Sequence, residues 1–313
     1  MTKNTNSMTA TGPSYSSRRP KIVALGGGHG LAQTLTAAKR YAASVTAVVS
    51  VADNGGSSKV FRDELNIPAV GDMRRCLLAL ADGENLLAQA MSYRFPEGAF
   101  ANHPVGNFLL AGLYEMTDNL ESASREFGKS LNIKGNVLPA CNSNVTLVAT
   151  TESGEEITGQ TAIVRQSDIS SVRLTGSDVN TPESVIAAIG EADQIIVGPG
   201  SLYTSLLAAL GAGGIREAFT ASRAQKIYIA NLHAQNYETL GYSVADHVNA
   251  LLRHGIECEV ILLPLRHEME LGKLPKHVGV FVDDLSDGSG AIHDPSLLGK
   301  ALQKIWYLIE TPA

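Results

Sequence analysis

Cysteine is scarce in this chain of 313 residues: the three cysteines, Cys76, Cys141 and Cys258, lie far apart and form no Cys-x-x-Cys pair. An odd, sparse count argues against a disulfide framework and a zinc site, and favours reduced thiols in the cytosol. Apolar runs are short as well, and none reaches the roughly 18 residues that a membrane-spanning helix requires. We therefore expect a cytoplasmic protein without a membrane span.

Basic runs are also missing, since nowhere do five Lys or Arg residues follow one another, and the formal net charge is -6. General nucleic-acid binding depends on clustered cations and is not expected. Residues 1–20 are polar, rich in Ser and Thr, and lack the apolar segment of a signal peptide. We expect them to form a disordered tail that ends at Pro20.

Apolar residues make up 44% of the chain, which is enough for a sizeable core. A short apolar strand, Lys21–Leu25, is followed by a glycine loop, a helical pattern over Leu31–Tyr41 and a β-branched run over Val45–Val51. Strand and helix patterns alternate again over 182–309. This alternation at both ends predicts a single α/β domain over residues 21–313, with a doubly wound, mostly parallel, Rossmann-like sheet.

The pattern changes between residues 135 and 165. Two β-branched runs, Val145–Ala149 and Ile157–Ile163, bracket the turn signal Glu152-Ser-Gly154. Such spacing is typical of an antiparallel hairpin. We expect a small antiparallel β insertion within the domain at about 135–165.

Two glycine loops follow predicted strands and open predicted helices. They are Gly26-Gly-Gly-His-Gly30 and Gly198-Pro-Gly-Ser201. Glycine lets the backbone approach a phosphate, and a helix N-terminus attracts an anion. The first loop has neither the Gly-x-Gly-x-x-Gly spacing nor the Walker A sequence. Because both loops fall at the carboxyl ends of strands, we expect a phosphorylated ligand to span the switch point of the sheet.

Polar residues follow the second strand and open a further helix. Asp53, ahead of Asn54, holds a position where an acid commonly binds ribose or a metal. In Gly71-Asp-Met-Arg74, Arg74 carries the guanidinium that fits phosphate oxygens, and Asp72 is the expected N-cap of a helix over 73–81. A capped turn and a surface ion pair are the alternative interpretations.

Another predicted helix begins at His103-Pro-Val-Gly-Asn107. Asn107 offers both a donor and an acceptor, which suits a nucleobase edge or a sugar hydroxyl. We expect Arg74 and Asn107 to face the ligand. A histidine such as His103 is more often structural, and that interpretation stays open.

These segments, in this order, resemble the CofD-like family, most closely its YvcK branch, the gluconeogenesis factors. The motifs that carry the resemblance are Gly26–Gly30, Val51–Ser58, Gly71–Arg74, His103–Asn107, Gly198–Ser205 and Asp246–Val248. The resemblance implies a nucleotide-sugar ligand such as UDP-N-acetylglucosamine, and a role in growth on gluconeogenic carbon sources and in cell shape. The related transferase branch moves a phospholactyl group onto a deazaflavin precursor and uses magnesium, linked there to the acid after the second strand.

Three segments depart from the YvcK pattern. Asn54 replaces a second acid, which leaves magnesium binding open, with Asp53 as its ligand if a metal binds. Lys59-Val60 stands in place of a Gly-Arg pair, and Asn236-Tyr237 in place of Pro-Gly.

The sequence favours a regulator that binds a nucleotide sugar without catalysis, because no Gly-x-Ser-x-Gly, His-Glu-x-x-His or metal-spaced cluster occurs. The alternative is a magnesium-dependent phospholactate-type transferase that acts on a deazaflavin (F420) precursor. Self-association is left open. The expected ligand-binding residues are Gly27, Gly28, His29, Gly30, Asp53, Asn54, Ser57, Ser58, Asp72, Arg74, His103, Asn107, Gly198, Gly200, Ser201, Thr204 and Asn231.

Overall fold

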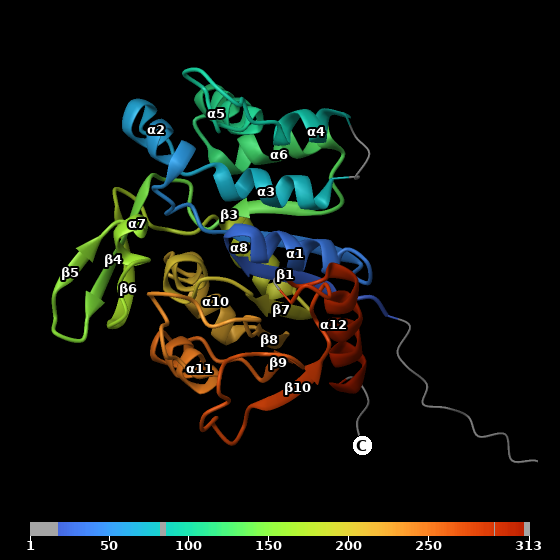
Figure 1. Ribbon diagram of the computed structural model, residues 1–313. Coiled ribbons are helices and arrows are strands. Elements are labelled where there is room, and N and C mark those ends of the chain that lie inside the picture. The colour runs from blue at the N-terminus through green and yellow to red at the C-terminus, as the bar shows by residue number, and fades with distance from the viewer. Residues whose placement is uncertain (1–17, 82–85, 291, 310–313) are drawn as a thin grey trace, which may run out of the picture.

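A parallel sheet of seven strands forms the centre of the computed structural model (Figure 1), which describes residues 18–81, 86–290 and 292–309. The strands are β1 (Lys21–Gly26), β2 (Ser44–Val49), β3 (Asn136–Pro139), β7 (Gln194–Val197), β8 (Gln225–Ile229), β9 (Val260–Pro264) and β10 (Gly279–Asp283). All neighbours pair in parallel in the order β10-β9-β8-β7-β1-β2-β3. The order reverses between β1 and β7, so the predicted doubly wound α/β fold is confirmed.

Helices cover both faces of this sheet. On one face, α1 (Gly28–Ala38) packs against α3 (Gly71–Leu80) and the C-terminal α12 (Pro295–Ile309). On the other face, α8 (Glu183–Glu191) packs against α10 (Ile215–Ala221). Right-handed crossovers place these two groups on opposite faces because the strand order reverses. The other helices are α2 (Gly56–Leu65), α4 (Leu86–Ser92), α5 (Val105–Thr117), α6 (Leu120–Leu131), α7 (Gln160–Ile163), η1 (Leu202–Leu207), α9 (Ala208–Leu210) and α11 (Val244–Arg253).

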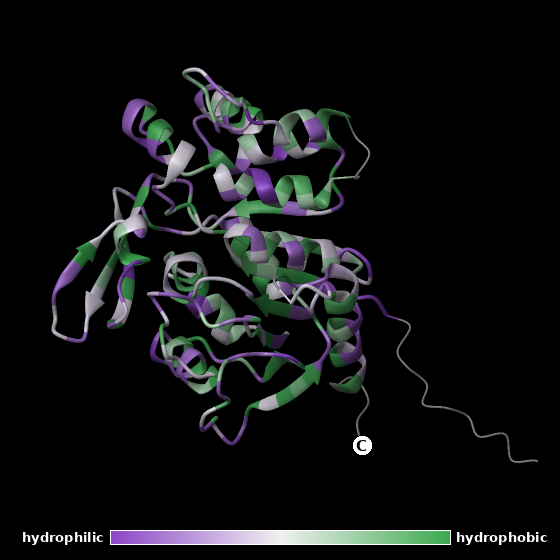
Figure 2. Cartoon of the chain, in the orientation of Figure 1, coloured by the Kyte–Doolittle hydropathy of each residue, from purple (hydrophilic) through white to green (hydrophobic). Residues whose placement is uncertain are grey.

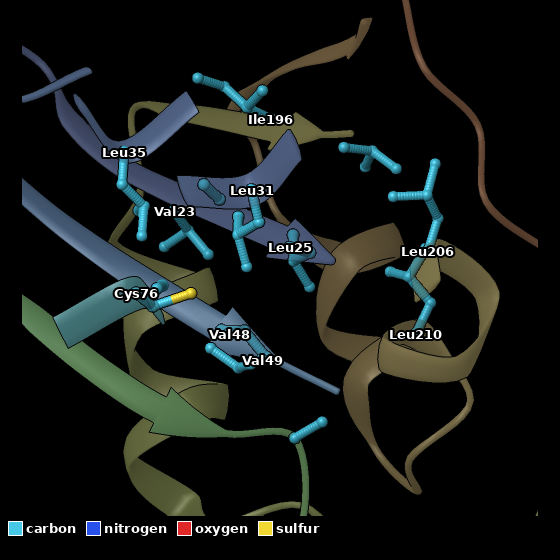
Figure 3. Close-up of a cluster of buried hydrophobic side chains, with 14 of the residues drawn as sticks. Val23, Leu25, Leu31, Leu35, Val48, Val49, Cys76, Ile196, Leu206 and Leu210 are labelled. Atoms are coloured by element: carbon cyan, nitrogen blue, oxygen red, sulfur yellow. The ribbon is translucent and has the colours of Figure 1, made fainter. Parts of the chain in front are cut away.

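The central strands are largely apolar beyond the polar residues at their amino ends (Figure 2). Every residue of β1 after Lys21 is buried, as expected for a parallel strand with helices on both faces. Figure 3 shows Val23 and Leu25 of this strand beside Leu31 and Leu35 of α1. Each fully buried side chain of this kind stabilises the fold by about 1.5–3 kcal/mol. Strands buried on both faces therefore consist of short continuous apolar runs, which is the pattern that the sequence shows.

A three-stranded antiparallel sheet stands beside the main sheet (green, at the left of Figure 1). It consists of β4 (Val145–Thr151), β5 (Glu156–Thr158) and β6 (Ile169–Gly176), with β4 in the centre. The predicted hairpin forms from β4 and β5. The bounds of the small sheet differ from the expected 135–165 at both ends, because β3 belongs to the main sheet and the third strand, β6, ends at Gly176. Gly159 has a φ of +94°, which ends β5 and lets the short helix α7 begin.

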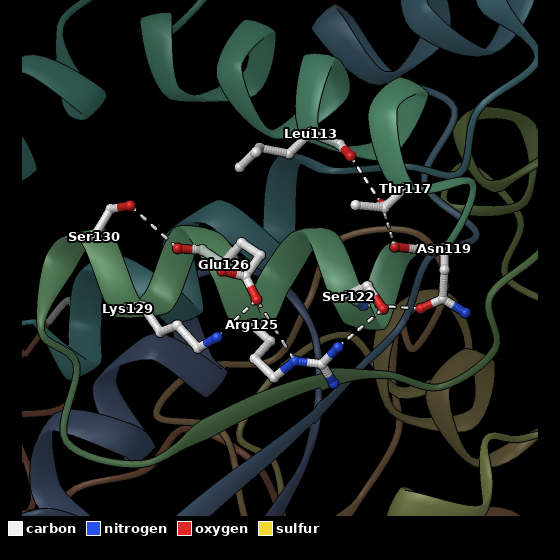
Figure 4. Close-up of polar contacts among 8 residues, drawn as sticks. All are labelled: Leu113, Thr117, Asn119, Ser122, Arg125, Glu126, Lys129 and Ser130. Atoms are coloured by element: carbon white, nitrogen blue, oxygen red, sulfur yellow. Dashed lines mark hydrogen bonds and ion pairs between the residues drawn. The ribbon is translucent and has the colours of Figure 1, made fainter.

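Local signals set the bounds of α6. The side chain of Asn119 accepts a hydrogen bond from the Ser122 amide at 2.8 Å, and the helix ends at Asn132 in the left-handed conformation. These two residues bracket the helix at Leu120–Leu131. On its exposed face, Glu126 pairs with Lys129 at 2.8 Å (Figure 4).

Of the predicted tail, residues 1–17 lie outside the described residues. Residues 18–20 pack on the folded chain: Arg18 pairs with Asp193 and its carbonyl accepts from the Trp306 indole at 3.1 Å. The Arg19 guanidinium donates to the Tyr41 carbonyl at 3.0 Å. In the described part of the chain, no helix has the length and apolar character needed to cross a bilayer.

Candidate functional site

The two glycine loops lie side by side at the carboxyl ends of β1 and β7, which pair directly. A Cβ atom on Gly30 would come within 2.2 Å of the Pro199 carbonyl oxygen, so this close approach requires glycine. The Thr34 hydroxyl of α1 donates to the Gly198 carbonyl at 2.9 Å and joins the loops. The structure thus brings both loops to the switch point.

The first loop is held by a hydrogen bond to the side chain of Asp72. The Gly28 amide donates to one Asp72 carboxylate oxygen at 2.6 Å, and Arg75 pairs with the other oxygen. The prediction that Asp72 is an N-cap is wrong: Val70 holds that position. Asp72 lies in the first turn instead and reaches across to α1. Burial raises the pKa of Asp72, while Arg75 and the Gly28 amide oppose that rise.

The second loop is held by side chains that follow β8. The Asn231 side chain accepts from the Gly200 amide at 2.9 Å and donates to the Gly200 carbonyl at 3.1 Å. The Gln235 amide donates to the Ser201 hydroxyl at 3.1 Å. Asn231 therefore holds the loop backbone at Gly200, and Gln235 holds the side chain of Ser201.

The carboxylate of Glu238 faces the N-terminus of η1, the helix that follows the second loop. It accepts from the Thr204 hydroxyl at 2.9 Å and is only 1% exposed. Burial raises the pKa of Glu238 to about 7, although the Thr204 hydroxyl and the first amides of η1 favour the ionised form. No local motif marks Glu238 for this role, because Thr204 lies 34 residues away along the chain.

Replacing Glu238 by glutamine is expected to flatten the pH dependence of stability. The folded pKa of about 7 exceeds the ordinary value of 4.5, so the folded state binds an extra proton between these values. The extra proton stabilises the folded state fully below about pH 4.5, and this stabilisation is lost as the pH rises through 7. The free energy of unfolding falls by at most about 3 kcal/mol over this range.

The measurement is thermal unfolding from pH 5 to pH 8. Glu238→Gln should melt higher than the wild type at pH 8 and should lose the wild type's fall in melting temperature above pH 5. Parallel melting curves for the two proteins over this range would assign the pH dependence to other groups.

Asp53 and Asn54 shape the loop after β2. The two carboxylate oxygens of Asp53 accept from the Gly55 amide at 3.0 Å and the Ser58 hydroxyl at 2.8 Å. Asn54 accepts from the Thr161 amide at 2.9 Å, which ties the loop to α7 after the strand β5. Within the described residues, no group of three or more His, Cys, Asp or Glu side chains could hold a metal ion. Both oxygens of the Asp53 carboxylate already accept hydrogen bonds from the loop itself.

Arg74 and Asn107 form a buried pair between α3 and α5. The Arg74 Nε atom donates to the Asn107 side-chain oxygen at 2.9 Å, and the residues are 5% and 3% exposed. Room for Arg74 comes from Gly106, where a Cβ atom would lie 2.8 Å from Arg74 Cδ. Burial, with Arg75 and Arg94 nearby, lowers the pKa of Arg74 to about 10. No carboxylate among the described residues pairs with it.

Three further predicted side chains are partly or fully accessible to solvent. His29 is exposed on the first loop, Ser57 is half-buried at the start of α2, and His103 is half-buried ahead of α5. Burial and the nearby Arg75 lower the pKa of His29. The ring of His103 lies 6.0 Å from that of Phe108.

The model of one protein family, described as 2-phospho-L-lactate transferase CofD, matches residues 22–269. The chain belongs to the CofD family. Within that family it is similar to the gluconeogenesis factor of Halalkalibacterium halodurans, with 42% identity over 239 residues that cover 76% of this chain and 74% of the relative. The gluconeogenesis factor of Bacillus subtilis is also 42% identical over 239 residues, covering 76% and 75% of the two chains.

A solved structure has the same fold as this chain. The crystal structure of a UPF0052 family protein from Bacillus halodurans superimposes with a TM-score of 0.85 at 36% identity, and covers 92% of this chain and 100% of that chain. The resemblance to the gluconeogenesis factors of the CofD family is confirmed.

A cavity of about 770 Å³ lies elsewhere in this CofD family member. Its lining includes the first residues of β1, β2 and β3 and side chains of α6 and α8, and none of the predicted site residues. It therefore opens at the amino ends of the strands, away from the glycine loops.

Proposed function

We propose that this member of the CofD family is a cytoplasmic regulator of carbon metabolism and cell shape that binds a nucleotide sugar of the UDP-N-acetylglucosamine type. The ligand lies at the carboxyl ends of β1, β2 and β7, within one domain that spans residues 21–313. The observation that carries the proposal is Arg74, a buried guanidinium beside the first glycine loop with no paired carboxylate among the described residues. A buried charge is costly unless it is paired, and a phosphorylated ligand supplies the missing anion.

The acids at the loops support binding rather than proton transfer. Asp53, Asp72 and Glu238 each accept hydrogen bonds from the chain itself. Their carboxylates therefore hold the loops in place. The relatives named gluconeogenesis factor support the link to carbon metabolism.

Isothermal titration calorimetry with UDP-N-acetylglucosamine tests the proposal, with ADP-glucose as the comparison ligand. We expect saturable binding of the uridine nucleotide and weaker binding of the adenine nucleotide. The absence of saturable heat at millimolar UDP-N-acetylglucosamine would overturn the proposal. Formation of a phospholactyl product from a deazaflavin precursor, activated phospholactate and magnesium, seen by mass spectrometry, would favour the transferase instead.

A further inference from the structure

Residues 93–104 form a braced loop between α4 and α5. The Val105 amide donates to the Tyr93 carbonyl at 3.0 Å, and isolated bridges join residue 94 to 104 and residue 95 to 101. The exposed Arg94 also donates to the Asn102 carbonyl within the loop. The guanidinium of Arg94 is thus carried by a loop with its own hydrogen bonds rather than by a free segment.

The base of this loop stands against Arg74. Val105 is followed by Gly106, where a Cβ atom would meet Arg74 Cδ at 2.8 Å and the Met91 carbonyl oxygen at 2.9 Å. The chain therefore enters and leaves the loop beside the buried arginine. In agreement, the positive charge of Arg94 contributes to lowering the pKa of both Arg74 and His29.

The charges at this place are not balanced. Arg75 is paired with Asp72, but the hydrogen bond of Arg94 goes to a neutral carbonyl and that of Arg74 to a neutral amide. Neither of these two guanidinium groups has a paired carboxylate among the described residues. Neighbouring cations repel one another, so a doubly charged anion between them is favourable.

The backbone amides of the glycine loops are less available to such an anion. The Gly28 amide is bonded to Asp72, and the Gly200 amide to Asn231. Glu238 faces the first amides of η1. The charged side chains, rather than these amides, are therefore the groups left to bind phosphate oxygens.

We propose that Arg94, together with Arg74, binds the diphosphate of the nucleotide ligand above the N-terminus of α1. The assignment of the anion to a nucleotide sugar rests on the proposed function, whereas the preference for a diphosphate rests on the two guanidinium groups, each of which matches phosphate oxygens. Arg94 was not among the residues expected from the sequence. It lies outside the glycine motifs, on a loop whose position depends on α4 and α5.

The test compares Arg94→Ala with Arg216→Ala, an exposed arginine that pairs with Glu217 on α10. Each protein is titrated with inorganic pyrophosphate, UDP-N-acetylglucosamine and uridine, and its folding is checked by thermal unfolding. We expect Arg94→Ala to bind pyrophosphate and UDP-N-acetylglucosamine about ten-fold more weakly than the wild type, the effect of losing a hydrogen bond to a charged group. Uridine binding should be unchanged, and Arg216→Ala should match the wild type.

The outcomes separate the two proposals. Wild-type binding of pyrophosphate that weakens in Arg94→Ala, without tighter binding of UDP-N-acetylglucosamine, would retain the diphosphate site and overturn the nucleotide-sugar function. Unchanged affinities of Arg94→Ala for pyrophosphate and UDP-N-acetylglucosamine would overturn the role of Arg94 and leave that function standing. If the wild type binds neither pyrophosphate nor UDP-N-acetylglucosamine, both proposals are wrong.

Discussion

Arg74→Met is expected to weaken binding of UDP-N-acetylglucosamine by about 10- to 100-fold, or roughly 1.5–3 kcal/mol, because a hydrogen bond to a charged group is lost. The unliganded variant should nevertheless be about as stable as the wild type. Arg74 is 5% exposed and has no paired acid among the described residues, so its charge is costly to bury. Methionine fills the space flexibly and removes the buried charge, and these gains offset the roughly 1.5–3 kcal/mol lost with the hydrogen bond to Asn107.

Calorimetric unfolding without ligand and titration with ligand separate these two effects. Arg216→Met is the matched control, since Arg216 is exposed on α10 and lies outside the site. If Arg74→Met unfolds at a much lower temperature yet binds with unchanged affinity per folded molecule, Arg74 is structural and its place in the site is wrong.

Gly30→Ala is expected to destabilise the protein by about 3 kcal/mol, the upper part of the range for overpacking a close contact. The added methyl group would lie 2.2 Å from the Pro199 carbonyl oxygen and 2.8 Å from its carbonyl carbon. These atoms are backbone of the second loop, which is held by Asn231 and by Thr34. Relief therefore requires the two loops to separate, and ligand binding should weaken together with stability.

Gly112→Ala provides the control for this substitution. Gly112 lies within α5 and is exposed, and a Cβ atom there meets nothing within 4 Å. Alanine is the better helix former, so this variant should gain up to about 1 kcal/mol. Thermal unfolding of the three proteins tests the prediction. If Gly30→Ala melts at the same temperature as the wild type, the loops separate easily and the prediction is wrong.

Much of the candidate site could be predicted from the sequence because its signals are local. A strand that ends in glycines and is followed by a helix places Gly26–Gly30 and Gly198–Ser201 at the carboxyl edge of the sheet. Parallel pairing of β1 with β7 then follows from the doubly wound order. What these signals do not contain is the partner of each loop amide.

The internal partners of the loops come from distant parts of the chain. Gly28 and Asp72 are 44 residues apart, and Thr204 and Glu238 are 34 apart. Aspartate is a common N-cap residue, and Asp72 stands at the start of a helix. Its sequence neighbours do not show whether its side chain caps that helix or bonds to α1. The position of Arg94 could not be predicted either, because the distance between its loop and Arg74 depends on how α3 and α5 pack.

The sequence by itself determined the elements and their alternation, because strand burial and helix caps act within a few residues, as the bounds Leu120–Leu131 of α6 illustrate. It also determined which edge of the sheet carries the glycine loops. Only the tertiary structure decided which acids hold those loops, that β3 joins the main sheet, and that Arg74 lies buried without a paired carboxylate among the described residues. The physical reason is that electrostatic pairing and burial depend on distances through space, which packing sets and spacing along the chain does not.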